Sequence, residues 1–503
     1  MSSLARRLLF AAGWQLAGNA SRMALGLVAS VLFVRWLGAD QYGQAAWFLS
    51  LTLYINIIVS AGLGTPLTRR LAICRARGDR AGMLGLLRHL LALRALSLVP
   101  AALMLLAAAI WLPATTGPRV LVWYVLAILA VSFVNASMVR SLQVCFRQDV
   151  MALLTSGEVV VKLGLVWWWS HGTATAATLL GAGAVAEGLS TLVAAWFLSR
   201  SLPKRAPGVP APAVADEDAP GLMALLREGR PTWLLSLAER ILGREIDVLI
   251  IGLLASPAQV TVYTLGYTVA NLGISLTTSA AESTTNLTAF TEAGTAGKGT
   301  PRRLLRAMTE FWLLLVVPAA VGGAVVGPRV LKSFYGSAAE GAGVVCAVLF
   351  AALALMALAA IGRDALLGAG RDRRAVIVFG AGGLVNLALS LLLTRPLGAL
   401  GPALGTLAGA IVTTALIFRR EVTPAALWRG RRPLLVCAAA LCGLAGAAKL
   451  TAELGPGTLT LLATIAAGAL AYVLVLAILK PRTSLRPVAC AWRGPVAMLR
   501  VIL

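Results

Sequence analysis

The sequence is poor in charged residues, and in acidic residues above all. Only 13% of its 503 residues are charged, and 20 Asp and Glu residues stand against 44 Lys and Arg residues. Soluble domains have about 25% charged and about 45–50% apolar residues, whereas this chain is 59% hydrophobic and has a mean hydropathy of +0.85. The composition therefore excludes a soluble globular protein, and a lipid bilayer must surround most of the folded chain.

Residue types that carry chemistry are scarce as well. The two His and six Cys residues form neither a CxxC motif nor a Cys–His cluster, so we expect no metal, no cofactor and no disulfide framework. The chain also has no Walker loop, no HExxH motif and no GxSxG motif. Because the loops expected on the outer side are short, the chain is predicted not to be an enzyme.

Apolar windows recur along nearly the whole chain, each near the length of about 20 residues that a helix needs to cross a bilayer. The windows are bounded by charged residues, Pro and Gly. They lie at residues 10–34, 44–64, 84–112, 119–140, 150–170, 174–198, 231–255, 260–285, 304–327, 343–366, 374–394, 397–418, 433–450 and 457–479. The pattern predicts an all-α integral membrane protein with about 14 transmembrane helices.

The basic residues indicate the topology of these helices. Lys and Arg accumulate on cytoplasmic loops, and here they cluster in short segments between apolar windows, which argues against nucleic acid as a partner despite the net charge of +24. If the N-terminus is cytoplasmic, the outside loops hold only Arg35, Arg119, Arg329, Lys332, Arg395 and Lys449. An even number of helices then places both termini in the cytoplasm.

A Pro-rich segment divides the chain. The loop at 199–230 is the longest and has the composition of a linker. The segments Val34–Phe48 and Gly252–Gly266 match in position and polarity, which indicates a parallel repeat of six helices. The predicted organisation is an N-terminal lobe at 1–198 with helices one to six, a cytoplasmic linker loop at 199–230, a C-terminal lobe at 231–418 with helices seven to twelve, and helices thirteen and fourteen with a basic tail at 419–503.

Polar residues form stripes inside three of the windows. A charge at bilayer depth costs about 2.5–3.5 kcal/mol on the insertion scale, so it is expected to face a cavity or another charge. The stripes comprise Gln15, Asn19, Arg22, Gly26 and Ser30 in the first helix, Ser236, Glu239, Arg240, Gly243, Arg244 and Asp247 in the seventh, and Tyr263, Tyr267, Asn271, Thr278, Glu282 and Thr285 in the eighth. Together they predict a water-filled central cavity between the two lobes.

The arginines of these stripes suggest what the cavity binds. Arg22, Arg240 and Arg244 would lie on its wall, and Arg94 of the third helix is expected to reach it. Guanidinium groups bind phosphate and pyrophosphate well, so the substrate is expected to be an anion. The alternative is that the charges of the seventh helix neutralise one another and fix it to its neighbours. Glu158 and Lys162 fit an internal ion pair and a cavity wall equally well.

Three short stretches match the patterns of one known family. Arg35–Gly43 follows an apolar helix and fits R-x-L-G-x-x-x-Y-G, Asp247–Gly252 with the later Tyr263 fits D-x-L-[LI]-[LI]-G, and Leu397–Ala403 is similar to G-x-x-G-A-A. On these residues the chain resembles the polysaccharide (lipid-linked oligosaccharide) flippases, whose superfamily also contains the multidrug and toxin extrusion transporters.

The resemblance implies two six-helix lobes around a V-shaped cavity, two appended C-terminal helices and alternating access. It also implies transport of a polyprenyl-pyrophosphate-linked oligosaccharide, or a related glycolipid, from the inner to the outer leaflet of a bacterial inner membrane for cell-surface polysaccharide biosynthesis. The partners would be membrane lipids and a polysaccharide polymerase or glycosyltransferases. Arg22 matches the family's basic cavity residues and Asp247 its acidic residue at the end of helix seven, whereas Glu239, Arg240 and Arg244 depart from the common pattern.

Two groups of candidate residues follow. The expected substrate-binding residues are Arg22, Asn19, Arg240, Arg244, Arg94, Tyr267 and Asn271, and the candidates for cation or proton coupling are Glu239, Asp247 and Glu282. One alternative function is a drug or cation antiporter of the same superfamily, which the excess of Arg over isolated carboxylates disfavours. The other is a non-transporting scaffold of an envelope-assembly complex.

Overall fold

The computed structural model describes residues 3–60, 62, 64–111, 119–170, 174–202, 222–278, 290, 300–421, 460, 463–464, 466–468 and 470. The chain forms two compact units, one made of Met1–Arg240 with Val248–Thr261 and the other of Ile241–Asp247 with Val262–Leu503. Apart from the few positions between 460 and 470, predicted helices thirteen and fourteen lie outside the described residues, as does most of the predicted linker loop. The predicted lobe boundaries stay a prediction.

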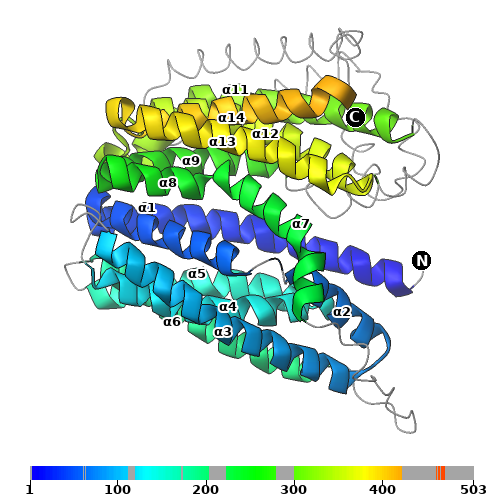
Figure 1. The fold of residues 1–503 in the computed structure, drawn as a ribbon. Coiled ribbons are helices and arrows are strands. Elements are labelled where there is room, and N and C mark those ends of the chain that lie inside the picture. The colour runs from blue at the N-terminus through cyan, green and yellow to red at the C-terminus, as the bar shows by residue number, and fades with distance from the viewer. Residues whose placement is uncertain are drawn as a thin grey trace. The chain divides into compact units, whose positions relative to one another are not determined.

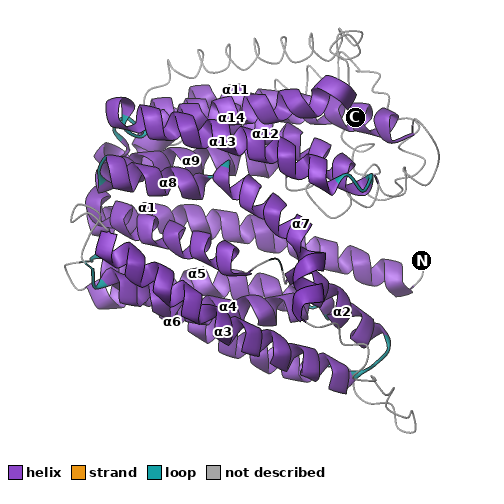
Figure 2. Cartoon of the chain, viewed as in Figure 1, coloured by secondary structure: helices purple, strands orange, loops and turns teal. Residues whose placement is uncertain are grey.

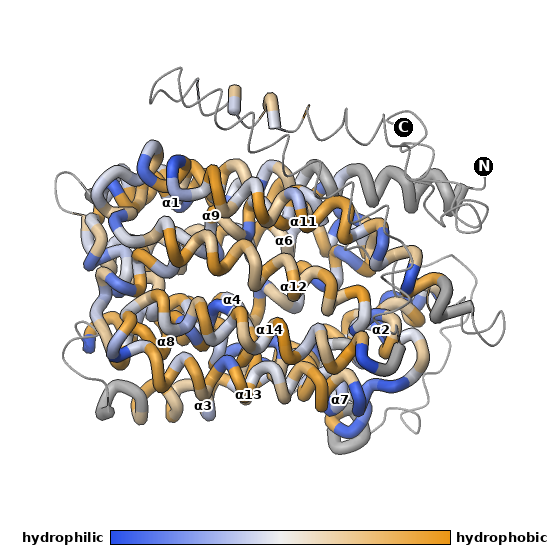
Figure 3. The backbone as a smooth tube through the Cα atoms, turned by 90° about the horizontal axis from the view of Figure 1, so that it is seen from above, coloured by the Kyte–Doolittle hydropathy of each residue, from blue (hydrophilic) through white to orange (hydrophobic). Residues whose placement is uncertain are grey.

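The described residues form helices and no strands (Figure 2). Nine of their helices are long and apolar enough to cross a membrane. The first of the nine runs from Gly18 to Ser60, which is enough for two crossings at about 20 residues each. Apolar residues line the helices, and hydrophilic residues gather near helix ends (Figure 3). The chain is therefore a multi-pass α-helical membrane protein, as its composition predicts.

The first unit begins with a helix, α1, that a kink divides in two (Figure 1). Helix α1 spans Ser3–Ser60, but Gly38 inside it has φ 76° and ψ 170°, a conformation that only glycine adopts without strain. The predicted outside turn between helices one and two is thus a kink. After a break, α2 (Gly64–Ala76) extends helically into a segment that the sequence assigns to a cytoplasmic loop.

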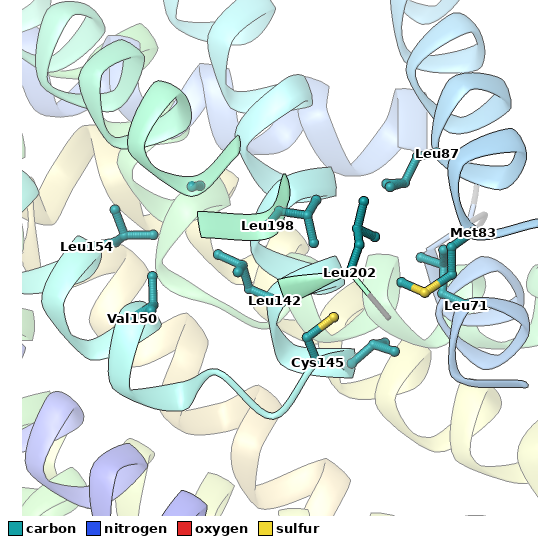
Figure 4. Packing of buried hydrophobic residues seen from close by; sticks show 11 residues of the cluster. Leu71, Met83, Leu87, Leu142, Cys145, Val150, Leu154, Leu198 and Leu202 are labelled. Atoms are coloured by element: carbon teal, nitrogen blue, oxygen red, sulfur yellow. The ribbon is translucent and has the colours of Figure 1, made fainter. Parts of the chain in front are cut away.

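Four further helices complete the N-terminal part of this unit: α3 (Arg80–Trp111), α4 (Leu121–Val144), α5 (Gln148–Ser170) and α6 (Ala176–Ser201). At one end a buried cluster joins α2 to α6 (Figure 4). Leu142 of α4 and Leu198 of α6 lie near the middle of the cluster, and Met83 of α3 and Leu71 of α2 lie side by side at its edge. Cys145 closes the cluster between α4 and α5. This apolar packing fixes how the five helices cross.

The predicted repeat segments contact each other inside the first unit. The Thr261 hydroxyl donates to the carbonyl of Ala39 at 2.5 Å, and Gly43 lies against the carbonyl of Pro257, where a Cβ would overlap it. In the alignment of Val34–Phe48 with Gly252–Gly266, Ala39 matches Pro257 and Gly43 matches Thr261. The alignment therefore maps the contact between Ala39 and Thr261 onto the contact between Pro257 and Gly43. This is the pattern that a two-fold axis produces.

The predicted seventh helix, 231–255, is broken. Helix α7 (Leu222–Ile241) ends before Gly243 and α8 (Arg244–Leu254) begins after it, followed by α9 (Pro257–Thr278). The prediction that Ser236 to Asp247 form one polar stripe on a single helix is therefore wrong, because residues on either side of the break do not lie on one continuous helix. Gly243 has a low helix propensity, and the freed backbone groups find other partners, as the site below shows.

The second unit contains the remaining described helices. They are α11 (Thr300–Tyr335), the short 3-10 helix η3 (Gly336–Ala339), α12 (Ala342–Gly368), α13 (Asp372–Leu397) and α14 (Leu400–Glu421). Helix α12 packs against α11, α13 and α14. Gly266 of α9 lies 3.1 Å, measured from an added Cβ, from the backbone nitrogen of Cys346 in α12. Each predicted window from 10–34 to 397–418 overlaps a helix of the structure.

Candidate functional site

Asp247 of the second unit is completely buried, with 0% of its surface exposed. Its Oδ2 accepts hydrogen bonds from the hydroxyls of Tyr263 at 2.5 Å and Thr406 at 2.6 Å. Its Oδ1 accepts from the amide of Asn386 at 3.0 Å and the hydroxyl of Ser390 at 3.3 Å. Within the described residues, no Lys, Arg or His forms an ion pair with this carboxylate. Four neutral donors from three helices thus surround one acid.

The broken helix explains why a carboxylate occupies this position. Asp247 lies in the first turn of α8, where the helix dipole favours a negative charge. The amide of Asn386 also donates to the carbonyl of Ile241, the last residue of α7, at 2.9 Å. One side chain therefore satisfies both the freed backbone and the acid. Discontinuous helices bring polar groups to membrane depth in transporters in the same way.

A glycine gives the polar side chains of α13 the room they occupy. A Cβ on Gly405 of α14 would lie 2.5 Å from Ser390 Oγ and 2.8 Å from Asn386 Oδ1. A Cβ on Gly409, one turn later, would lie 2.6 Å from the carbonyl of Gly382. Helices α13 and α14 can approach this closely only because these positions lack side chains.

The hydrogen bonds of the network can be rearranged. Ser390 Oγ lies 3.1 Å from Asn386 Oδ1, and Thr406 Oγ1 lies 3.0 Å from the carbonyl of Pro402, so each hydroxyl has a second acceptor besides Asp247. A hydroxyl hydrogen rotates freely and leaves lone pairs on the other side of the oxygen. These oxygens can therefore either donate to an ionised carboxylate or join it in binding a small cation.

Two more of the predicted residues lie beside this network. The rings of Tyr263 and Tyr267 stack with centroids 6.3 Å apart, and the guanidinium carbon of Arg244 lies 5.6 Å from the centroid of Tyr267. The structure therefore brings Arg244, Tyr267 and Asp247 together in the second unit. Asn271 is exposed and accepts a 3.5 Å hydrogen bond from Ser275. Glu282 lies outside the described residues.

A second group of charges lies in the first unit. Arg22 is exposed on α1, and its charge interacts with that of Glu158 on α5. Glu158 also interacts with Lys162 and with Glu187 of α6, whose carboxylate accepts a 2.7 Å hydrogen bond from Ser132. The internal pairing of Glu158 with Lys162 is thus part of a wider cluster that includes Arg22.

The other predicted residues of the first unit are scattered. Asn19 is half-buried on α1, and Arg94 is buried on α3 with its guanidinium carbon 5.3 Å from the centroid of the Phe133 ring. On α7, Glu239 is half-buried and Arg240 is exposed, and both have interaction partners. The predicted substrate-binding residues thus divide between the two units.

Sequence reasoning missed three of the hydrogen-bond donors to Asp247, namely Asn386, Ser390 and Thr406. Asn386 and Ser390 belong to a polar stripe, with Thr394 one turn further, inside the apolar window 374–394. All three residues of the stripe are fully buried. This stripe is the same kind of signal that singled out the first, seventh and eighth helices, so it was available in the sequence.

A comparison with protein-family models places the chain in a family. The model described as polysaccharide biosynthesis protein matches residues 9–285, more than half of the sequence. The chain belongs to this family. The match covers Asp247 and Tyr263 but ends before Asn386, so it includes only part of the buried network. A search of the curated proteins found no match.

Solved structures show that this member of the polysaccharide biosynthesis family has a transporter fold. The lipid II flippase MurJ in an inward closed conformation aligns with a TM-score of 0.68 and 15% identity, over 92% of this chain and 98% of that one. An inward-facing multidrug resistance transporter of the MATE family in the MOP superfamily aligns with a TM-score of 0.57 and 17% identity, over 83% and 99%. A MOP superfamily transporter from Pyrococcus furiosus aligns with a TM-score of 0.54 and 17% identity, over 82% and 95%.

Proposed function

We propose that the protein is a flippase that moves a polyprenyl-pyrophosphate-linked oligosaccharide, or a related glycolipid, from the inner to the outer leaflet. The observation that carries the proposal is the family match, because it covers more than half of the chain and names polysaccharide biosynthesis. The fold similarity to a lipid II flippase over 92% of the chain supports it. Alternating access of two lobes would let the headgroup cross without entering hydrocarbon, where unpaired polar groups are costly.

The arginines support an anionic substrate. Arg22 is exposed on α1, where its guanidinium can reach a ligand, and Arg244 lies beside Tyr267. We assign the pyrophosphate to Arg22 first, with Asn19, Arg94, Arg240, Arg244, Tyr267 and Asn271 as further candidate contacts. An Arg fork binds two phosphate oxygens at once and stays charged at any physiological pH. The oligosaccharide would then follow the pyrophosphate, while the polyprenyl chain stays in lipid.

Asp247 is the candidate for coupling transport to a proton or a monovalent cation. It supplies the single negative charge of a site whose other groups are three hydroxyls and one amide. Carboxylate, hydroxyl and amide oxygens suit a hard cation. Its hydroxyl partners have second acceptors, so the site can exist with or without the bound ion. Glu239 and Glu282 remain further candidates. A change in the occupancy of this site would alter the packing of α8, α9, α13 and α14, which all contribute to it.

The location and partners follow from this proposal. We infer a bacterial inner membrane with both termini in the cytoplasm, where the enzymes that build lipid-linked glycans release their products. A polysaccharide polymerase or a glycosyltransferase would then be the protein partner. A drug or cation antiporter is the second candidate, favoured by the similarity to MATE transporters and by the buried Asp247. A non-transporting scaffold is the third.

Reconstitution tests the proposal. Liposomes that contain the purified protein and a fluorescent polyprenyl-pyrophosphate oligosaccharide are treated with an impermeant quencher, which reports how fast lipid leaves the inner leaflet. We expect rapid exchange with the wild-type protein. With Arg22→Ala the exchange rate should be at least about tenfold lower, since a charge-assisted hydrogen bond contributes about 1.5–3 kcal/mol. Arg77→Ala, which removes an exposed charge between α2 and α3, is the matched control.

Each outcome separates the candidates. No exchange above that of protein-free liposomes would reject the flippase. If the same liposomes instead accumulate a cationic dye when an ion gradient is imposed, the antiporter is correct. Neither activity would favour the scaffold. If Arg22→Ala exchanges lipid at the wild-type rate, Arg22 does not bind the pyrophosphate.

A further inference from the structure

Two arginines of the first unit lie within electrostatic range of each other. Arg94 on α3 is only 5% exposed, and its Nη1 has no hydrogen-bond partner among the described residues. The positive charge of Arg140 on α4 acts on Arg94. The ring of Phe133 lies against the guanidinium of Arg94 on one side, and this aromatic contact does not neutralise the positive charge. A buried cation is therefore held beside a second cation with one donor unused.

The start of a helix adds to this positive potential. The guanidinium of Arg140 lies directly against Gly64, the first residue of α2, where a Cβ would overlap its Nη1. The first N–H groups of a helix have no partner inside the helix, and the dipole makes this end positive. One guanidinium group thus lies at a helix N-terminus where α2, α3 and α4 pack together, and the Arg94 guanidinium lies within range of its charge.

No negative group in the described part of the chain balances these charges. Glu228 pairs with Arg69 and Arg70 of α2, each at 3.7 Å, and Glu187 interacts with Lys162. Neither acid pairs with Arg94 or Arg140. Two like charges inside a membrane-spanning bundle are costly without a counter-charge, so an anion bound here would offset a real penalty.

We propose that Arg140, at the N-terminus of α2, and the neighbouring Arg94 bind a phosphate group of a lipid. Guanidinium forks and helix N-termini are the two protein groups best suited to phosphate. Both arginines lie in membrane-spanning helices, which favours a lipid phosphate over a soluble one. The identity of the lipid rests on the proposed function: the phosphate belongs either to the pyrophosphate of the transported glycolipid or to an anionic phospholipid of the bilayer.

Binding to the purified full-length chain in detergent tests this site without any transport step. Two probes distinguish the sources, farnesyl pyrophosphate for the substrate and short-chain phosphatidylglycerol for the bilayer, each titrated by calorimetry. We expect Arg94→Gln and Arg140→Gln each to weaken binding of at least one probe by about tenfold. Arg88→Gln, which removes an exposed charge from the same helix α3, should bind like the wild type.

The result assigns or overturns the site. Loss of farnesyl pyrophosphate binding alone makes it a substrate site, and loss of phosphatidylglycerol binding alone makes it a site for bilayer lipid. Wild-type binding of both probes by both variants, or no binding of either probe to the wild type, overturns the proposal. If Arg94→Gln does not fold, the half-buried Arg140 alone decides. A protein that binds a probe but does not flip lipid would contradict the proposed function and leave this site intact.

Discussion

At the scale of single residues, the chain buries charged side chains in very different surroundings. Asp247 accepts four hydrogen bonds from neutral donors, whereas Arg94 keeps one donor unused beside another cation. Neutral donors stabilise a buried carboxylate but do not cancel its charge. Asp247 is therefore suited to exchange a small cation, and Arg94 is suited to attract an anion.

Asp247→Asn tests the coupling role. The amide has nearly the same shape but carries no charge and cannot take up a proton. It also presents a donor to a shell of donors, so we expect a loss of stability of about 1–3 kcal/mol. In liposomes, the exchange rate of the wild-type protein should respond to an imposed proton or sodium gradient, and that of the variant should not.

Glu245→Gln is the control for this prediction, because it removes a carboxylate from the same turn of α8 that is outside the Asp247 network. Its gradient response should persist. A gradient response in Asp247→Asn equal to that of the wild type would show that coupling resides elsewhere.

At the scale of helices, glycines decide how closely neighbours pack. Between α13 and α14, Gly405 stands where a side chain would collide with Ser390 and Asn386. In α1, Gly38 turns one helix into two through a positive φ. Gly243 lies in the break that separates α7 from α8. The buried network depends on Gly405 and Gly243. Its groups come from α13 and α14, which meet at Gly405, and from α7 and α8, which the break at Gly243 separates.

Gly405→Ala adds a single methyl group and should therefore disturb the network. The added Cβ would lie 2.5 Å from Ser390 Oγ and 2.8 Å from Asn386 Oδ1, so α13 and α14 must separate or the hydrogen bonds must break. Such overpacking costs about 1–3 kcal/mol. Thermal unfolding in detergent measures the effect.

Gly380→Ala on α13 is the matched substitution, since nothing lies within 4 Å of its added Cβ. A helix gains about 1 kcal/mol when Ala replaces Gly, so this variant should be as stable as the wild type or more so. Equal melting temperatures for the two variants would refute the packing argument.

At the scale of the whole molecule, the chain combines a transporter fold with a strong bias in the placement of its basic residues. The fold extends over 92% of the chain in the comparison with MurJ. The basic residues sort to one side of the predicted membrane topology, and this sorting orients a membrane protein during insertion. The orientation of the termini can therefore be tested without knowing the substrate.

Cysteine labelling in intact cells provides this test. In a background without the six native cysteines, Arg119→Cys between α3 and α4 should react with an impermeant maleimide from outside. Arg77→Cys between α2 and α3 should react only after the membrane is permeabilised. Both positions are exposed in the structure, so access alone does not explain a difference. The reverse pattern would place the N-terminus outside.

The sequence by itself determined that a lipid bilayer surrounds the chain, that the fold is all-α, and where the helices lie approximately, because hydropathy is a property of a local window. It also singled out Asp247, Tyr263 and Tyr267 as polar residues of apolar helices. Only the tertiary structure decided which groups meet. Asn386, Ser390 and Thr406 lie 139 to 159 residues from Asp247 in the chain, and Arg140 joins Arg94 from another helix. Such meetings depend on helix breaks, rotations and crossings, which arise from packing and leave no local signal.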